Sequence, residues 1–136
     1  MGVIYLNYSS KGGDNVNLCW ITLSVKNMRE SLKFYNELLG IEIFKRFSPN
    51  PGIDIAMIGK KDGPKVELIC SGDNNSRIQT RGISIGFQVN SLDEIIEYMK
   101  EKGISIKRGP ISPSAGVRFF FIEDPDGVEI QIVESR

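Results

Sequence analysis

Hydrophobic and polar residues alternate in two separate stretches of the chain, and a turn containing Asp and Gly interrupts each stretch. Residues 53–69 read IDIAMIGKKDGPKVELI, and residues 119–133 read FFFIEDPDGVEIQIV. Alternation with a period of two is typical of strands with one buried face, and an Asp-Gly pair between two such runs predicts a hairpin. A shift of 64 positions aligns Ile58 with Ile122 and Val66 with Ile130. The pattern therefore predicts two copies of one hairpin.

The same series of signals precedes each hairpin. The shift of 64 positions places residues 20–25 on residues 84–89, and both runs predict a first strand. A helix is expected next, and after it the apolar runs at residues 41–44 and 104–106 predict another strand. Each half of the chain is therefore expected to contain one strand, one helix and three further strands.

The two predicted helices have matching end signals. Asn27 precedes Glu30 by three positions and Ser91 precedes Glu94 by the same spacing, which is typical of a side chain that caps the start of a helix. We therefore expect helices to begin near residues 28 and 92. Left-handed helix ends favour glycine, and two glycines stand at the expected ends: Gly40 and Gly103.

The repeat predicts one α+β domain made of two βαβββ modules. We assign residues 17–70 to the first module, 83–136 to the second, and 71–82 to a linker rich in Ser, Gly, Asp and Asn. Residues 1–16, with Val3 and Tyr5, form an N-terminal extension outside the repeat. Two half-sheets joined within the chain or across a homodimer would form a curved mixed-sheet cup with helices on the outer face. The alternative is two modules that share a core.

Composition and charge restrict the possible functions. Of the 136 residues, 17 are Lys or Arg and 17 are Asp or Glu, so we do not expect the basic surface of a nucleic-acid-binding protein. No apolar run approaches the roughly 20 residues that span a bilayer, and the N-terminus lacks the pattern of a signal peptide. We expect a cytoplasmic protein without nucleic-acid or membrane partners, with Cys19 and Cys70 as free, buried thiols.

The chain contains no histidine. Mechanisms that need an imidazole in this chain are therefore excluded, including Ser/His and Cys/His nucleophiles and His-ligated metal sites. Acid–base chemistry is left to Asp, Glu, Lys, Tyr and Cys. We expect residues 60–63 and 107–110 to form solvated turns, and Asp124 and Asp126 to shape their turn through bonds to the backbone.

Three segments of the chain resemble the vicinal oxygen chelate superfamily. They are the strand at residues 23–25, the segment SLKFYNELLG at residues 31–40, and the segment DPDGVEIQ at residues 124–131. The superfamily includes glyoxalase I, methylmalonyl-CoA epimerase, extradiol dioxygenases, fosfomycin-resistance enzymes and bleomycin-binding proteins. The resemblance covers about residues 17–134 and implies the two-module fold, but one fold hosts many chemistries.

The resemblance also identifies four positions at which the superfamily's metal enzymes hold a divalent cation. In this chain they are Trp20, Glu67, Ser84 and Gln131. Only Glu67 keeps the residue type of those enzymes, since an indole offers no lone pair to a cation and Ser is a weak ligand. We therefore expect no metal or other cofactor. The alternative is a weak divalent-metal site formed by Glu67 and Gln131.

If those four positions face the cup, strand alternation and the resemblance imply a pocket with aromatic walls. Such a pocket suits a flat, partly apolar small molecule. The expected ligand-binding residues are Trp20, Thr22, Ser24, Ile55, Met57, Glu67, Ile69, Ser84, Gln88, Phe119, Phe121 and Gln131.

Two of these residues have alternative interpretations. Trp20 provides a stacking face that clamps a ring system together with Phe119 and Phe121, or it fills the cup as ordinary core. Glu67 is the candidate catalytic residue, as a proton acceptor, or a counter-ion for a cationic ligand. Its alternative is a former ligand position that is now hydrogen-bonded to Gln131 or Ser84, or reached by solvent.

The sequence supports three functional hypotheses. The first is a metal-independent binder or sequesterer of a small, partly aromatic molecule, acting as a homodimer. The second is a lyase, epimerase or dioxygenase of the glyoxalase type with an altered, weak metal site centred on Glu67. The third is a structural or regulatory dimer with a filled cup.

Overall fold

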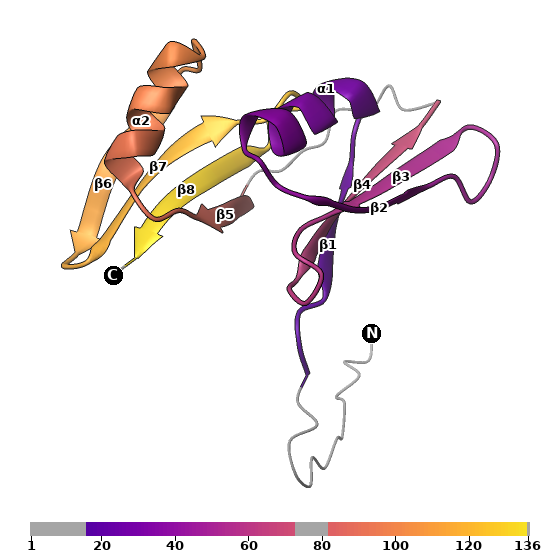
Figure 1. The fold of residues 1–136 in the computed structure, drawn as a ribbon, viewed down its shortest axis with the longest axis horizontal. Helices are drawn as coiled ribbons and strands as arrows, with labels where there is room; N and C mark the ends of the chain where they lie inside the picture. Colours follow the sequence, from indigo (N-terminus) through magenta and orange to yellow (C-terminus); the bar gives the residue numbers. More distant parts are fainter. Residues whose placement is uncertain (1–15, 73–81, 136) are drawn as a thin grey trace, which may run out of the picture.

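The computed structural model describes residues 16–72 and 82–135. Residues 1–15 of the predicted extension at residues 1–16, with Val3 and Tyr5, and most of the predicted linker therefore lie outside the described residues. Each half contains a helical segment and four strands (Figure 1). The first half contains β1 (Trp20–Ser24), α1 (Met28–Leu32), the π-helix η1 (Lys33–Leu38), β2 (Ile43–Phe47), β3 (Ile53–Ile58) and β4 (Lys65–Ser71). The second contains β5 (Ser84–Gln88), α2 (Leu92–Glu101), β6 (Arg108–Ser114), β7 (Val117–Glu123) and β8 (Glu129–Ser135).

The two sheets repeat the same strand order. It is β1-β4-β3-β2 in the first sheet and β5-β8-β7-β6 in the second. In both, the first strand runs parallel to the last, and the other neighbours are antiparallel. Ile58 is paired with Val66, and Ile122 is paired with Ile130, as the repeat predicts. The α+β fold of two βαβββ modules is therefore confirmed.

The two sheets are separate hydrogen-bonded units. Within residues 16–72 and 82–135, every strand ladder joins strands of one module. Figure 1 shows the sheets lying beside one another, with α1 near the junction. A continuous sheet across both modules is therefore not formed by the described part of a single chain.

The helix starts agree with the capping pattern. The side chain of Asn27 accepts a hydrogen bond from the backbone of Glu30, and that of Ser91 accepts one from Glu94. The helical segments end at Gly40 and Gly103, with φ of 72° and 70°. A left-handed conformation of this kind favours glycine, so the predicted helix ends are confirmed.

The predicted positions of the strands that follow the two helical segments need correction. Residues 104–106 do not form a strand: the backbone N–H of Ile104 donates to the carbonyl of Met99, and Ile104 and Ile106 pack against the core. These two isoleucines hold the connection between α2 and β6 against the core, and β6 itself begins at Arg108. In the first half, β2 begins at Ile43, two residues later than predicted.

A core lies between each sheet and its helical segment. In the first module, Leu23 and Leu68 project from the sheet toward Met28 and Leu32, and all four are buried. The second module buries Ile130 and Ile132 against α2 in the same way. Cys70 packs against this core, but Cys19 is exposed, so the prediction of a buried thiol at Cys19 was wrong. None of the described helices has the length and apolar character needed to cross a bilayer.

Candidate ligand-binding faces

The face of each sheet that is turned away from its helix, here called the open face, carries the predicted site residues. In the first sheet, Thr22 lies opposite Glu67, which lies opposite Met57. The next row contains Ser24, Ile69 and Ile55. Side chains paired in this way project to one side of a sheet. The structure therefore places the first-module residues of the predicted site on one surface.

Glu67 is half-buried and hydrogen-bonded on this surface. The hydroxyl of Thr22 donates to its Oε1 at 2.8 Å. Gln131 and Ser84 were the partners expected from the sequence, and the partner in the structure is Thr22. This bond fixes one carboxylate oxygen of Glu67 at the centre of the open face.

Trp20 begins the edge strand β1 and is 52% exposed. A tryptophan that filled a cup as core would be buried, so this alternative is wrong for the single chain. Ile43, Phe44 and Phe47 of β2, at the opposite edge of the sheet, are also exposed large apolar residues. Both edges of the first sheet therefore present apolar side chains to solvent.

The open face of the second sheet is aromatic. Gln131 lies between Phe121 and Gly86, and a Cβ added at Gly86 would stand 3.5 Å from the Oε1 of Gln131. The ring centroids of Phe119 and Phe121 are 5.5 Å apart with an interplanar angle of 82°. Gln88 and Ser84 are exposed on the adjacent edge strand. The absence of a side chain at Gly86 leaves Gln131 open toward that edge.

The second face also carries a cation, Arg108, that was not predicted from the sequence. Arg108 is paired with Phe121 across β6 and β7, and its guanidinium lies 4.1 Å from the centroid of the Phe121 ring. It also forms an ion pair with Glu129 of β8. Residues 107–110 were expected to form a solvated turn because β6 was predicted too early in the chain. The correct register of β6 would have identified Arg108, since it places Arg108 in the row of Phe121 and Gln131.

The four metal-ligand positions do not form a metal site in this chain. Trp20 and Glu67 lie on the first sheet, whereas Ser84 and Gln131 lie on the second. Within the described residues, no group of three or more Cys, Asp or Glu side chains is arranged to hold a metal ion. One carboxylate and one amide are a poor donor set for zinc or nickel. The residues present therefore do not fit a tightly bound divalent cation.

A buried polar cluster connects the modules away from the open faces. The hydroxyl of Tyr35 donates to the Oδ2 of Asp124 at 2.6 Å, and Asp124 Oδ1 accepts from the backbone of Asp126 and Val128. Burial raises the pKa of Asp124, although these hydrogen bonds act in the opposite direction. Burial and the neighbouring Asp124 carboxylate raise the pKa of Tyr35, so its phenol stays protonated. Asp124 shapes its turn as predicted, but its role between modules was not anticipated.

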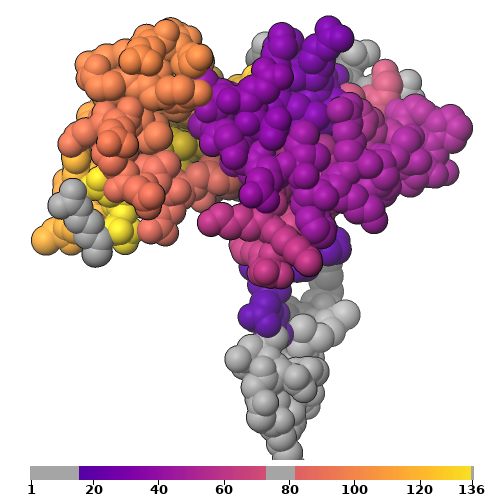
Figure 2. Space-filling view, viewed as in Figure 1, coloured from indigo at the N-terminus to yellow at the C-terminus, as the bar shows by residue number. Residues whose placement is uncertain are grey.

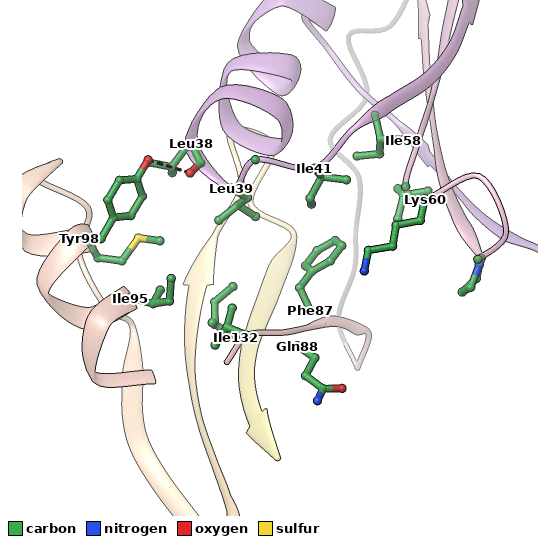
Figure 3. Close-up of a pocket in the computed structure, with 17 residues that line it drawn as sticks. Leu38, Leu39, Ile41, Ile58, Lys60, Phe87, Gln88, Ile95, Tyr98 and Ile132 are labelled. Atoms are coloured by element: carbon green, nitrogen blue, oxygen red, sulfur yellow. Dashed lines mark hydrogen bonds between the residues drawn. The ribbon is translucent and has the colours of Figure 1, made fainter. Parts of the chain in front are cut away.

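A cavity of about 400 Å³ also lies between the modules, on the helix-covered side. Figure 2 shows the two modules as adjacent lobes, and Figure 3 shows the cavity between them. Ile58 and Ile132, which face the helices, form part of its wall. Of the predicted site residues, Gln88 alone lines it. This cavity was not predicted from the sequence, because it depends on how the modules pack.

Comparisons with known proteins agree with this geometry. The family model described as the glyoxalase/bleomycin resistance protein/dioxygenase superfamily matches residues 17–132. A lactoylglutathione lyase of Haemophilus influenzae is 30% identical over 84% of this chain and 89% of its own. A glyoxalase I of Leishmania major superposes with a TM-score of 0.75 at 20% identity, covering 88% of this chain and 87% of its own. TnmS3, an antibiotic-binding protein from a Streptomyces species, superposes with a TM-score of 0.69 at 15% identity, covering 91% and 99%.

Proposed function

Because the chain belongs to the glyoxalase/bleomycin resistance protein/dioxygenase superfamily, we propose that it binds and sequesters a small, partly aromatic molecule without a metal. One observation carries the proposal: the sole tryptophan, Trp20, stands exposed at a metal-ligand position of the superfamily, on the sheet face that presents Glu67. An indole stacks on rings and does not ligate cations. The structural likeness to an antibiotic-binding protein supports the same class of function.

The chemistry of the two open faces supports an aromatic ligand. The first face offers the Trp20 ring and the Glu67 carboxylate. The second offers the partly exposed Phe119 ring and the Gln131 amide, whereas Phe121 is buried at 8% exposure and supports the Phe119 ring from below. Apolar walls with a few fixed polar groups are typical of small-molecule sites. A flat ring system with a positively charged or hydrogen-bonding edge would use both kinds of group.

We propose that a homodimer completes the site. The two sheets of the described chain are not hydrogen-bonded to each other, and large apolar side chains are exposed at the edges of the first sheet. Joining the first module of one copy to the second module of another would bury these edges and bring the two faces together. Light scattering after size exclusion should then give the mass of a dimer at micromolar concentration, and a monomer that binds the ligand would contradict this arrangement.

The binding proposal is tested with 1-methylquinolinium, a flat aromatic cation, and with neutral 1-methylnaphthalene as its matched control. We expect saturable binding of the cation by calorimetry, with a change in Trp20 emission. Loss of the stacking ring in Trp20→Ala should weaken binding of both probes by roughly two- to tenfold. Glu67→Gln should weaken binding of the cation and leave the neutral probe unaffected.

Undiminished affinity in the Trp20→Ala variant would show that the stacking role is wrong. The absence of saturable binding of either probe would contradict an open aromatic site and favour a filled cup. Glu97→Gln is a suitable control variant, because it removes an exposed carboxylate from α2, on the helix-covered side of the second sheet. It should bind both probes as the unmodified chain does.

The alternative function is that of a lyase, epimerase or dioxygenase with Glu67 as base or metal ligand. The curated relative named lactoylglutathione lyase favours it, and the donor set of this chain opposes it. Metal analysis of the purified dimer separates the two functions. One divalent ion per site, bound with micromolar or tighter affinity and lost in Glu67→Gln, would establish the alternative and overturn the metal-free proposal.

A further inference from the structure

The cavity between the modules has the composition of a second ligand site. Its wall is formed by aliphatic and aromatic side chains from both modules, including Leu39 and Ile41 after η1 and Phe87 and Val89 from β5. Its volume of about 400 Å³ lies within the range of about 300–1,000 Å³ that is typical of small-molecule sites. Of the expected ligand-binding residues of the open faces, Gln88 alone reaches this cavity, so the cavity does not depend on Trp20, Glu67 or the other side chains that carry the function proposed above.

The charge around this cavity is one-sided. Lys60, in the turn between β3 and β4, is the charged residue among the described residues that line it, and no Asp or Glu contributes to the lining. Figure 3 shows the Lys60 side chain extending toward Phe87. Lys65, in contrast, donates to backbone carbonyls of the same turn, at Lys61 and Gly63. The described residues offer Lys60 no ion-pair partner, so its ammonium is available to a ligand at the cavity mouth.

We propose that this cavity binds a medium-chain aliphatic carboxylate, with the chain among the apolar residues and the carboxylate on Lys60. The apolar wall supplies most of the affinity, because each methylene group that is buried strengthens binding by about fourfold. The single cation selects an anionic head over a neutral or cationic one. Two neutral polar side chains also reach the wall. The Tyr98 hydroxyl donates to the carbonyl of Leu38 at 2.9 Å, and Gln88 contributes an uncharged amide, so Lys60 remains the one charged group among the described residues of the lining.

Isoleucine methyl groups report the site directly. Titration of the full chain with decanoate, followed by NMR of labelled Ile δ1 methyls, should shift the residues of the cavity wall and leave Ile55 and Ile69 on the open face unchanged. Decanol, with the same chain and no charge, should bind more weakly than decanoate. The methyl groups expected to shift belong to Ile41, Ile58, Ile95 and Ile132.

Two lysine variants separate the charge effect from general changes in the turn. Lys60→Met should weaken decanoate binding about two- to fivefold at low salt, as expected for one exposed ion pair, and abolish the preference over decanol. Lys61→Met, one position along the turn and outside the cavity lining, should bind decanoate normally. Shifts at Ile55 and Ile69 alone, equal losses in both lysine variants, or no saturable shift below the micelle concentration of decanoate would each overturn the proposal.

Discussion

The two modules share the arrangement of their strands but differ in the chemistry of their open faces. On the helix-covered sides, equivalent positions of the repeat are buried and apolar, as Leu68 and Ile132 are. One residue away, Glu67 in the first module corresponds to Gln131 in the second. Close packing restricts the volume and polarity of buried side chains, whereas the open faces are free of that restriction. The differences between the modules are therefore concentrated on the surface where we propose ligand binding.

The helices show how the repeat tolerates a difference in length. The segment from Asn27 to Gly40 is one residue longer than the segment from Ser91 to Gly103. The second segment forms the regular helix α2, whereas the first continues from α1 into the π-helix η1. In a π-helix the hydrogen bonds join residues five positions apart, not four, so one extra residue fits into the turn while both helix ends keep their positions. The extra residue therefore leaves the capping residues at equivalent positions in both modules and changes only the type of helix between them.

The largest expected effect comes from the buried side of this comparison. Leu68→Ala and Ile132→Ala should each lower the free energy of unfolding by about 2–5 kcal/mol, because each removes a buried side chain and leaves its volume unfilled. Glu67→Gln, next to Leu68 in the chain, should change stability by no more than about 0.5 kcal/mol. Denaturant unfolding measures all three. A loss of stability in Glu67→Gln comparable to that in Leu68→Ala would contradict the assignment of alternating faces.

The two tyrosine hydrogen bonds that join the modules should contribute differently to stability. Tyr35→Phe removes the donor to a buried carboxylate oxygen of Asp124 and should cost about 1–3 kcal/mol of unfolding free energy. Tyr98→Phe removes a half-buried bond to the Leu38 carbonyl and should cost about 0.5–1.5 kcal/mol. Thermal and denaturant unfolding of both variants test the order. A larger effect of Tyr98→Phe would show that the buried cluster is not the main polar contact between the modules.

Asp124 and Asp54 should give opposite dependences of stability on pH. Burial raises the folded-state pKa of Asp124, so its contribution is present below the ordinary pKa and is lost as pH rises through the raised value. The hydrogen bond from Arg46 lowers the pKa of Asp54, so its contribution is present above the ordinary value and is lost as pH falls through the lowered one. Between pH 3 and pH 8, the raised pKa of Asp124 should make the free energy of unfolding fall as pH rises. The Asp124→Asn variant should not show this fall. An unchanged profile in that variant would contradict the assignment.

The smallest expected effect is that of the Arg46–Asp54 pair, which joins β2 and β3 at 2.8 Å. Both side chains are partly exposed, so a double-mutant cycle of Arg46→Met and Asp54→Asn should give a coupling of about 0.2–1 kcal/mol. The coupling should decrease in 1 M salt. A value that does not depend on salt would indicate a shielded pair and a more closed sheet edge than the structure has.

Much of the fold was predictable because local signals coincided with the repeat. Capping residues identified both helix starts, and alternation identified both hairpins, since each depends on interactions a few residues apart. The strand at residues 104–106 was predicted wrongly because short apolar runs can anchor a connection as well as form a strand. The correct position, at Arg108, depends on pairing with β7, which local pattern does not specify.

The candidate site was predictable as two sets of side chains but not as one site. Strand alternation and the family resemblance assigned Thr22, Glu67, Phe121 and Gln131 to the cup-facing side. The pairing of Thr22 with Glu67 and of Phe121 with Gln131 comes from the strand registers. How these sets approach one another depends on the packing of modules or chains, which alternation does not encode. The same reason explains why the cavity beside Lys60 and the contact between Tyr35 and Asp124 had no sequence signal.

The contact between Tyr35 and Asp124 has a consequence for the order of events during synthesis. The first module contains every strand of its own sheet, so its hydrogen-bonded ladder can close once residue 71 has left the ribosome. The acceptor for the Tyr35 hydroxyl lies 89 residues further along the chain. The Tyr35 phenol of the nascent first half therefore lacks this acceptor until residue 124 has been synthesised, and folding of the second module supplies it.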